Sequence, residues 1–154
     1  MLLVALLIGV QAVPSDRLSV FKPFVGACWR TEFSPTVVDT HCFETLYDGA
    51  HVRDRHQVRD GGKTIYAGET VYSANRSDIV FTYINSLGGV GHGTARANGD
   101  AIEFVGRMRA SPDQAQQPID SEWHMLSPDS YDVRSLTKAG STPPDKPLVF
   151  TRIK

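Results

Sequence analysis

From Gly26 onward, the chain is a series of short runs rich in Val, Ile, Thr, Tyr and Phe, separated by clusters of Gly, Asp, Asn, Pro and Ser. The clusters recur roughly every 8 to 14 residues, a spacing typical of antiparallel β-structure. A sandwich or a closed barrel could hold these strands. The pattern predicts about ten strands, near residues 26–33, 37–47, 51–59, 64–73, 79–85, 90–97, 101–109, 119–126, 130–137 and 147–153.

A short helix is predicted immediately before the strands, over Asp16 to Phe24. Leu18 and Phe21 recur there at helical spacing, and the acidic residue at the start is a favourable N-cap. Two Pro-containing stretches, at 111–118 and 138–147, are predicted to be loops. Neither an internal repeat nor a linker divides the chain, so we expect one folded domain.

The segment Met1 to Ala12 has no charged side chain and ends just before a polar stretch. This pattern is typical of a secretory signal peptide, with small residues before a cleavage site after Ala12. A buried N-terminal strand has a similar composition. A bilayer span takes roughly 20 apolar residues, so we expect no stable membrane span. The sequence predicts a signal peptide at 1–12, a domain at 13–154, and a secreted or periplasmic protein.

The two cysteines are predicted to face each other across the first hairpin. A turn centred on Pro35 lies midway between Cys28 and Cys42. Directly opposed strand residues have Cα atoms about 4.5 to 5.5 Å apart, which a disulfide can bridge. Two cysteines so placed in an exported protein are expected to form a disulfide, whereas in a cytosolic protein they would be reduced thiols.

The register of the second hairpin follows from a strong turn signal, Asp48 followed by Gly49. Centring the hairpin there pairs Glu44 with Arg53 and His41 with His56. Because side chains alternate along a strand, one face carries the charged cross-strand pair and is predicted to be the outer one. The outer face then holds Cys42, Glu44, Arg53 and Arg55, and the inner face holds His41, Phe43, Asp54 and His56.

A third turn, at Gly61 and Gly62, extends this register to the next strand. It places Ile65, Ala67, Glu69 and Val71 on the inner face, so that Glu69 lies near Asp54. The barrel interior would then hold a polar cluster formed by His41, Asp54, His56 and Glu69.

Three interpretations of this cluster stay open. It could be a structural network that pairs with Arg96 or Arg107 across the lumen, because buried carboxylates need partners. It could orient a ligand, or it could be a catalytic or metal site. None of the compact ligand spacings that identify zinc motifs is present, so the sequence predicts no metal site.

The segment Phe24 to Arg30, with Gly26 and Trp29, resembles the first strand of lipocalin-like (calycin) barrels. The likeness extends to Arg53–His56 and to Trp123. It is closest to uncharacterised bacterial proteins of this kind and more distant from nitrobindin-type haem barrels. The resemblance implies an all-β fold, an antiparallel up-and-down β-barrel of about ten strands with a short N-terminal helix. This chain has two residues between Gly26 and Trp29 where the family has one, so we expect a shifted or bulged start to the strand.

A haem cofactor is the alternative that this resemblance raises. The nitrobindin-type ligand is a late histidine, and the only late histidine here is His124, which points outward if Trp123 faces the lumen. His92 lies in the run Gly88–Gly93, which lacks the lysine of a phosphate-binding loop and fits a bulged or sharply bent strand. The sequence therefore predicts no cofactor, with haem as the alternative.

Composition narrows the possible partners. The 16 basic and 17 acidic residues nearly cancel and are interspersed, so nucleic acid is not an expected partner.

Barrels of this kind enclose an interior lined by alternate side chains, which favours binding of a small apolar or amphipathic molecule by a monomer or weak dimer. An enzyme using the His/carboxylate cluster and a scaffold barrel without a cavity are the alternatives. The predicted ligand-binding residues are His41, Phe43, Asp54, His56, Glu69 and Trp123.

Overall fold

The structure is a computed structural model that describes residues 16–136 and 146–153. The predicted signal peptide lies outside the described residues, as does most of the predicted loop at 138–147. Within the described ranges, no helix is long and apolar enough to span a bilayer.

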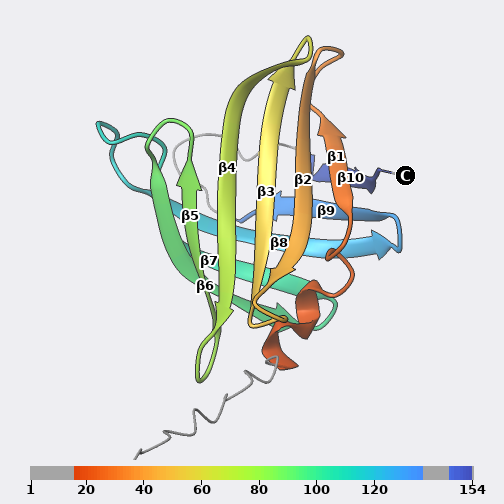
Figure 1. Cartoon of the computed structure of the whole chain (residues 1–154), viewed down its shortest axis with the longest axis vertical. Helices are drawn as coiled ribbons and strands as arrows, with labels where there is room; N and C mark the ends of the chain where they lie inside the picture. The colour runs from red at the N-terminus through yellow and green to blue at the C-terminus, as the bar shows by residue number, and fades with distance from the viewer. Residues whose placement is uncertain (1–15, 137–145, 154) are drawn as a thin grey trace, which may run out of the picture.

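Ten antiparallel strands form a closed barrel, which confirms the predicted fold class (Figure 1). Each strand pairs with the next along the chain, and β1 pairs with β10 to close the sheet. A short 3₁₀-helix, η1 (Asp16–Phe21), precedes the strands where the sequence predicts a helix. The strands are β1 (Cys28–Glu32), β2 (Val37–Leu46), β3 (His51–Asp60), β4 (Lys63–Ala74), β5 (Ile79–Asn85), β6 (Val90–Asn98), β7 (Ala101–Arg109), β8 (Gln117–Ser127), β9 (Ser130–Ser135) and β10 (Leu148–Arg152).

The first hairpin has the predicted register. Cys28 lies opposite Cys42, their Cα atoms are 4.1 Å apart, and the two residues form a disulfide. The neighbouring Trp29 is fully buried on the inner face, so the disulfide lies on the outer face. The irregular start of this strand is also confirmed, because β1 begins only at Cys28, after Gly26 with a φ of 77°.

The second hairpin is confirmed as well. Glu44 pairs with Arg53, and His41 pairs with His56. The Arg53 guanidinium donates to Oε1 of Glu44 at 2.6 and 3.0 Å on the outer face. Asp54 is 2 % exposed and faces the interior.

The predicted register of the third hairpin is wrong beyond the turn. Lys63 and Thr64 pair as expected, but the ladder shifts by one residue at a β-bulge, so that Tyr66 pairs with Val58. Ile65 is the extra residue and is half exposed. A one-residue shift moves every later side chain to the opposite face. The residues predicted to face inward after the turn, Ile65, Ala67, Glu69 and Val71, therefore do not, and β4 instead presents Tyr66, Gly68, Thr70 and Tyr72 to the interior.

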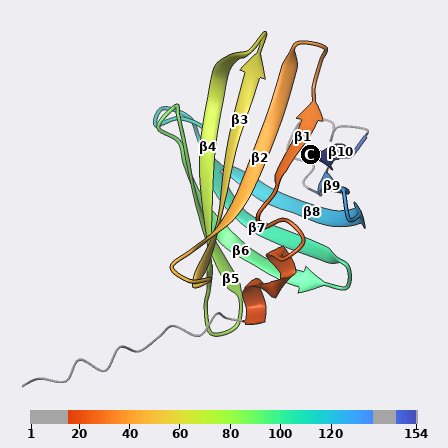
Figure 2. The ribbon, with the colours of Figure 1, turned by 45° about the vertical axis from the view of Figure 1, so that its right-hand side comes forward.

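The helix η1 lies at one end of the barrel (Figures 1 and 2). Aromatic side chains fill the part of the barrel next to it. Phe21 of η1 packs on Tyr72 at 4.4 Å between ring centroids. Phe24, in the segment that enters the barrel, contacts the ring of Trp29 and accepts a hydrogen bond from its indole nitrogen. The rings around Phe24 are those of Phe21, Trp29, Phe43, Trp123 and Tyr131.

The glycines of β6 form no bulge. The ladders of β6 are continuous on both sides from Val90 onward, so the bulge is wrong as one of the two forms, bulged or sharply bent, predicted for the run Gly88–Gly93. Gly93 pairs with Gly106, and a Cβ at either position would collide with backbone and with the Phe81 ring. These glycines therefore let the Phe81 ring lie directly against the sheet.

We predict that replacing both cysteines by alanine leaves the fold intact and lowers the free energy of unfolding by about 3 kcal/mol, because the disulfide closes a loop of about 15 residues. Urea unfolding of the wild type and the double variant, each with and without a reductant, measures this. Reductant should destabilise only the wild type, and an equal response of both proteins would contradict the prediction.

Candidate functional site

The lumen contains a hydrogen-bonded cluster built on His41. Its Nδ1 lies 2.7 Å from Oδ2 of Asp54 on β3, and its Nε2 lies 3.2 Å from Oδ2 of Asp39, two residues earlier on β2. The side chains of Asp39 and Asp54 are 9 % and 3 % exposed. Both ring nitrogens of His41 are therefore engaged by buried carboxylates.

His56 stacks on His41, with ring centroids 4.7 Å apart, and extends the cluster toward β4 and β5. Its Nε2 lies 3.1 Å from the hydroxyl of Tyr83, which is also hydrogen-bonded to the hydroxyl of Tyr66. The absence of a side chain at Gly68 makes room for this arrangement. A Cβ there would lie 2.5 Å from the Tyr83 hydroxyl and closer still to Nε2 of His56.

The electrostatics of the cluster favour a protonated His41. Burial by itself would lower the pKa of His41, but the charge of Asp54 and the hydrogen bonds to Asp39 and Asp54 outweigh it and raise the pKa to about 10. Burial opposes ionisation of Asp39 too, yet its contacts with His41 and His56 hold its pKa below the usual range. At neutral pH, His41 is therefore an imidazolium between two carboxylates.

Two of the sequence expectations about this cluster are wrong. Glu69 is not in it, because the bulge places Glu69 opposite Arg55 on the outer face, 3.8 Å from Arg53. Arg96 does not pair with lumenal carboxylates, since it binds Glu103 on the outer face, and Arg107 is exposed. Among the described residues, only histidines form ion pairs with Asp39 and Asp54.

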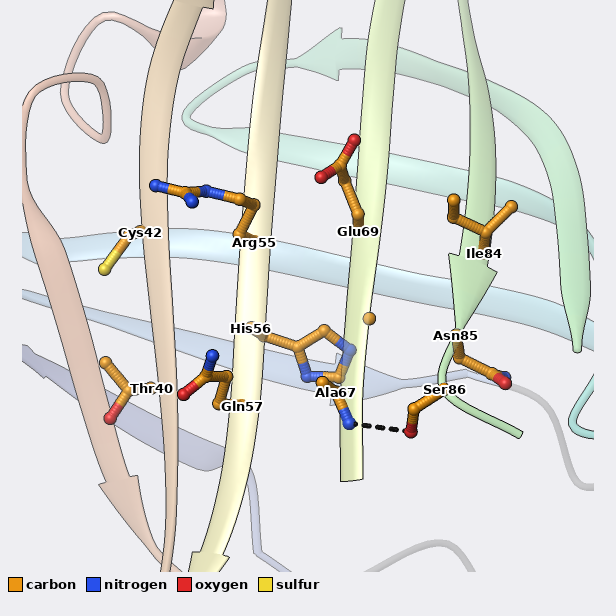
Figure 3. A pocket seen from close by; sticks show the side chains of 11 residues that line it. Thr40, Cys42, Arg55, His56, Gln57, Ala67, Glu69, Ile84, Asn85 and Ser86 are labelled. Carbon is orange, nitrogen blue, oxygen red and sulfur yellow. Dashed lines mark hydrogen bonds between the residues drawn. The ribbon is translucent and has the colours of Figure 1, made fainter. Parts of the chain in front are cut away.

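The outer face carries a groove of about 480 Å³ across β2 to β5 (Figure 3). Arg55 and Glu69 lie side by side in it near Cys42, while the His56 ring extends toward β4. The amide of Ala67 donates to the Ser86 hydroxyl at 3.1 Å along its lower edge. Exposed charged side chains flank this groove. A ligand bound there would therefore be removed from water less completely than a ligand in the lumen.

A lumenal cavity of about 280 Å³ adjoins the polar cluster. Trp123 and Phe104 form part of its apolar wall, with ring centroids 4.6 Å apart, and His41, Asp54 and His56 form part of its polar wall. Of the six predicted ligand-binding residues, these three and Trp123 line the cavity, Phe43 packs on Trp123, and Glu69 is outside. The remaining lining residues are Tyr66, Thr70, Tyr72, Phe81, Tyr83, Met108, Ile119 and Ser121.

The residues that line the lumen do not fit a haem. His92 is exposed, and His124 points away from the lumen toward Asp132 at 3.1 Å and Glu122 at 3.5 Å. Of the two lumenal histidines, His41 has partners at both ring nitrogens, and His56 has Nε2 bound to the Tyr83 hydroxyl and Nδ1 facing Asp39. Neither histidine that the sequence raised as a haem ligand therefore faces the interior.

Asp39 is the main residue of the site that sequence reasoning missed. The sequence does indicate its position, because Asp39 precedes His41 by two residues on the same strand and must share the face of His41. Tyr66 and Tyr83 could not be found in this way, since the bulge displaces the first and the second comes from a strand beyond it.

The fold is similar to that in the crystal structure of Rv2717c from M. tuberculosis. The match covers 91% of this chain and 99% of that chain, with a TM-score of 0.57 and 15% sequence identity. No protein-family model matches the chain, and neither does any curated protein sequence. At this identity, the likeness shows the fold alone.

We predict that Gly68→Ala costs about 1 to 3 kcal/mol of stability, because the new methyl group collides with His56 and Tyr83. Removing the Tyr83 hydroxyl relieves part of the collision. In a Tyr83→Phe background, the same glycine substitution should therefore cost less. A double-mutant cycle from urea unfolding measures this coupling, and strictly additive effects would contradict it.

Proposed function

We propose that this protein is exported and that its barrel binds a small amphipathic molecule in the lumen. The observation that carries the proposal is the cavity of about 280 Å³ with an apolar aromatic wall on one side and a charged, hydrogen-bonded wall on the other. Ligand pockets range from roughly 300 to 1,000 Å³. A cavity at the lower limit suits a compact molecule with one aromatic or aliphatic body.

The charge of the polar wall favours a particular polar head. Asp39 and Asp54 carry two negative charges and the imidazolium of His41 carries one positive charge, which leaves one negative charge among these three groups. A buried negative charge attracts a cationic or hydrogen-bond-donating group and repels a carboxylate. The ligand proposed is therefore apolar at one end and carries an amine or hydroxyl at the other.

Two alternatives receive less support. Acid–base catalysis by His41 would need a pKa near neutral pH and a free ring nitrogen, whereas both of its nitrogens are engaged and its pKa is about 10. A scaffold barrel would have an interior filled by its own side chains, and the lumenal cavity argues against that arrangement.

Export is supported by the charge-free segment Met1 to Ala12 and by the Cys28–Cys42 disulfide. Disulfides persist in oxidising compartments and are rare in the cytosol.

Three small probes that differ only in their head group test the binding proposal: 2-phenylethylamine, 2-phenylethanol and phenylacetate. We expect the amine and the alcohol to bind and phenylacetate not to, as measured by saturation-transfer NMR in buffer containing EDTA. Ser121→Phe should weaken binding by about tenfold or more, because the phenyl ring takes the place of the ligand in the cavity.

Thr82→Phe is the matched control, because Thr82 lies on the outer face and is exposed. It should bind the probes as the wild type does. Thermal unfolding shows whether each variant folds. Equal binding to the wild type and Ser121→Phe would place the probes outside the lumen and contradict the proposal.

For export, we expect the chain expressed with its own N-terminus in a bacterium with a periplasm to be recovered from the periplasm or medium, beginning at Val13. Intact mass gives the N-terminus and shows whether Cys28 and Cys42 are oxidised. A full-length chain with reduced cysteines in the cytosol would contradict this prediction.

A further inference from the structure

We propose that Asp39, His41 and His56 form a zinc site at the polar end of the lumen. One donor atom from each of the three residues lies within 4.8 Å of the other two. Two imidazole nitrogens and one carboxylate oxygen are a donor set that zinc takes when it has three protein ligands and leaves a fourth position for water or a ligand.

Asp39 contacts both histidines at distances close to those between neighbouring ligands of a zinc ion. Zinc bonds to nitrogen and oxygen of about 2.0 to 2.1 Å place neighbouring ligand atoms about 3.3 to 3.4 Å apart. In the structure, Oδ1 of Asp39 lies 3.4 Å from Nδ1 of His56, and Oδ2 of Asp39 lies 3.2 Å from Nε2 of His41. Asp39 therefore lies between the two histidines, with one oxygen facing each inferred nitrogen ligand, and donor atoms taken one from each residue lie within 4.8 Å of one another.

Unpartnered buried atoms point to the same position. Oδ1 of Asp39 and Nδ1 of His56 are both buried and neither has a hydrogen-bond partner, although they face each other. When Nε2 of His56 carries the proton and donates it to Tyr83, the lone pair of Nδ1 faces a carboxylate oxygen. A cation between these two atoms would give both of them a partner.

The surrounding residues orient the histidines as metal ligands require. Metal-bound histidines almost always use their second ring nitrogen to bind a carboxylate, a carbonyl or water. Here Nδ1 of His41 is held by Asp54 at 2.7 Å, and Nε2 of His56 is held by the Tyr83 hydroxyl at 3.1 Å. Both histidines therefore keep the inferred ligand atom, Nε2 of His41 and Nδ1 of His56, on the Asp39 side.

Charge balance also favours a divalent ion. Two buried carboxylates have only histidines as ion-pair partners among the described residues. Zn²⁺ with two neutral imidazoles cancels the charges of Asp39 and Asp54.

The stacked rings, inclined at 25°, have to rotate for their lone pairs to converge. Both rings border the cavity, which gives them room.

The test is titration of EDTA-stripped, tag-free protein with Co²⁺, a spectroscopic substitute for zinc, in the absence of any organic ligand. We expect one equivalent to produce the visible absorption bands of a four-coordinate ion, which Zn²⁺ then abolishes. Asp39→Asn and His56→Gln should weaken binding by more than 100-fold. Asp54→Asn, which removes only an orienting partner, should weaken it by about 10- to 100-fold.

His124→Gln is the matched control, because His124 lies with Glu122 and Asp132 in a second His/carboxylate group on the outer face. It should bind Co²⁺ as the wild type does. An absence of four-coordinate bands in the wild type would overturn the proposal, as would unchanged binding by Asp39→Asn or loss of binding by His124→Gln.

A measurement on the wild type keeps the test valid if a variant does not fold. Zinc should shift the side-chain ¹⁵N resonances of His41 and His56 and leave those of His51, His92 and His124 unchanged. The opposite pattern would overturn the proposal. Since no organic probe is present, failure here and failure of the small-molecule proposal are separate results.

Discussion

The negative charges of two carboxylates buried inside a narrow barrel have to be balanced by groups within the barrel. This constraint determines the arrangement of the polar half of the lumen. Asp39 and Asp54 meet at His41, whose two nitrogens reach both of them. An imidazolium in this position offsets part of the cost of removing two charges from water. Loss of the His41 ring would leave both carboxylates without their shared partner, so the neighbouring strands β2 and β3 depend on it.

Packing of the aromatic half of the lumen holds the polar half in position. Phe24 enters the barrel from the segment after η1 and contacts rings on β1, β2, β8 and β9. Tyr131 stacks on Phe150, and the Phe150 ring meets His41 edge-on at 5.1 Å. The aromatic packing therefore continues directly into the charged cluster, and the position of His41 is fixed by packing as well as by hydrogen bonds.

Local turn signals explain which parts of this arrangement could be predicted from the sequence. Pro35 and the Asp48–Gly49 pair define the centres of two hairpins, and alternation then assigns every residue from Cys28 to Val58 to a face. The bulge at Ile65 has no comparable signal, because an extra residue in a strand depends on how the sheet curves to close. The bulge alone is the reason why Glu69 lies on the outer face and not on the predicted inner face.

The sequence predicts a lined interior, but the size and shape of the cavity could not be predicted for a related reason. Its walls combine residues from β2 to β5, β7 and β8, and the sequence contains no local pattern that indicates how strands so far apart face each other across the lumen. His41 and Trp123 were correctly expected to face the interior, yet their separation depends on closure of the whole sheet. Gly68 illustrates the same limit, because its missing side chain matters only once His56 and Tyr83 converge on it.

The two proposals for the lumen are coupled through charge. With a proton on His41, the cluster keeps one negative charge; with zinc and two neutral histidines, the charges of Asp39 and Asp54 are cancelled. Since His41, Asp54 and His56 also form a wall of the cavity, the occupant of the cluster changes the field that a ligand head group meets. By linkage, a ligand that prefers one charge state must in turn favour the ion or proton that creates it.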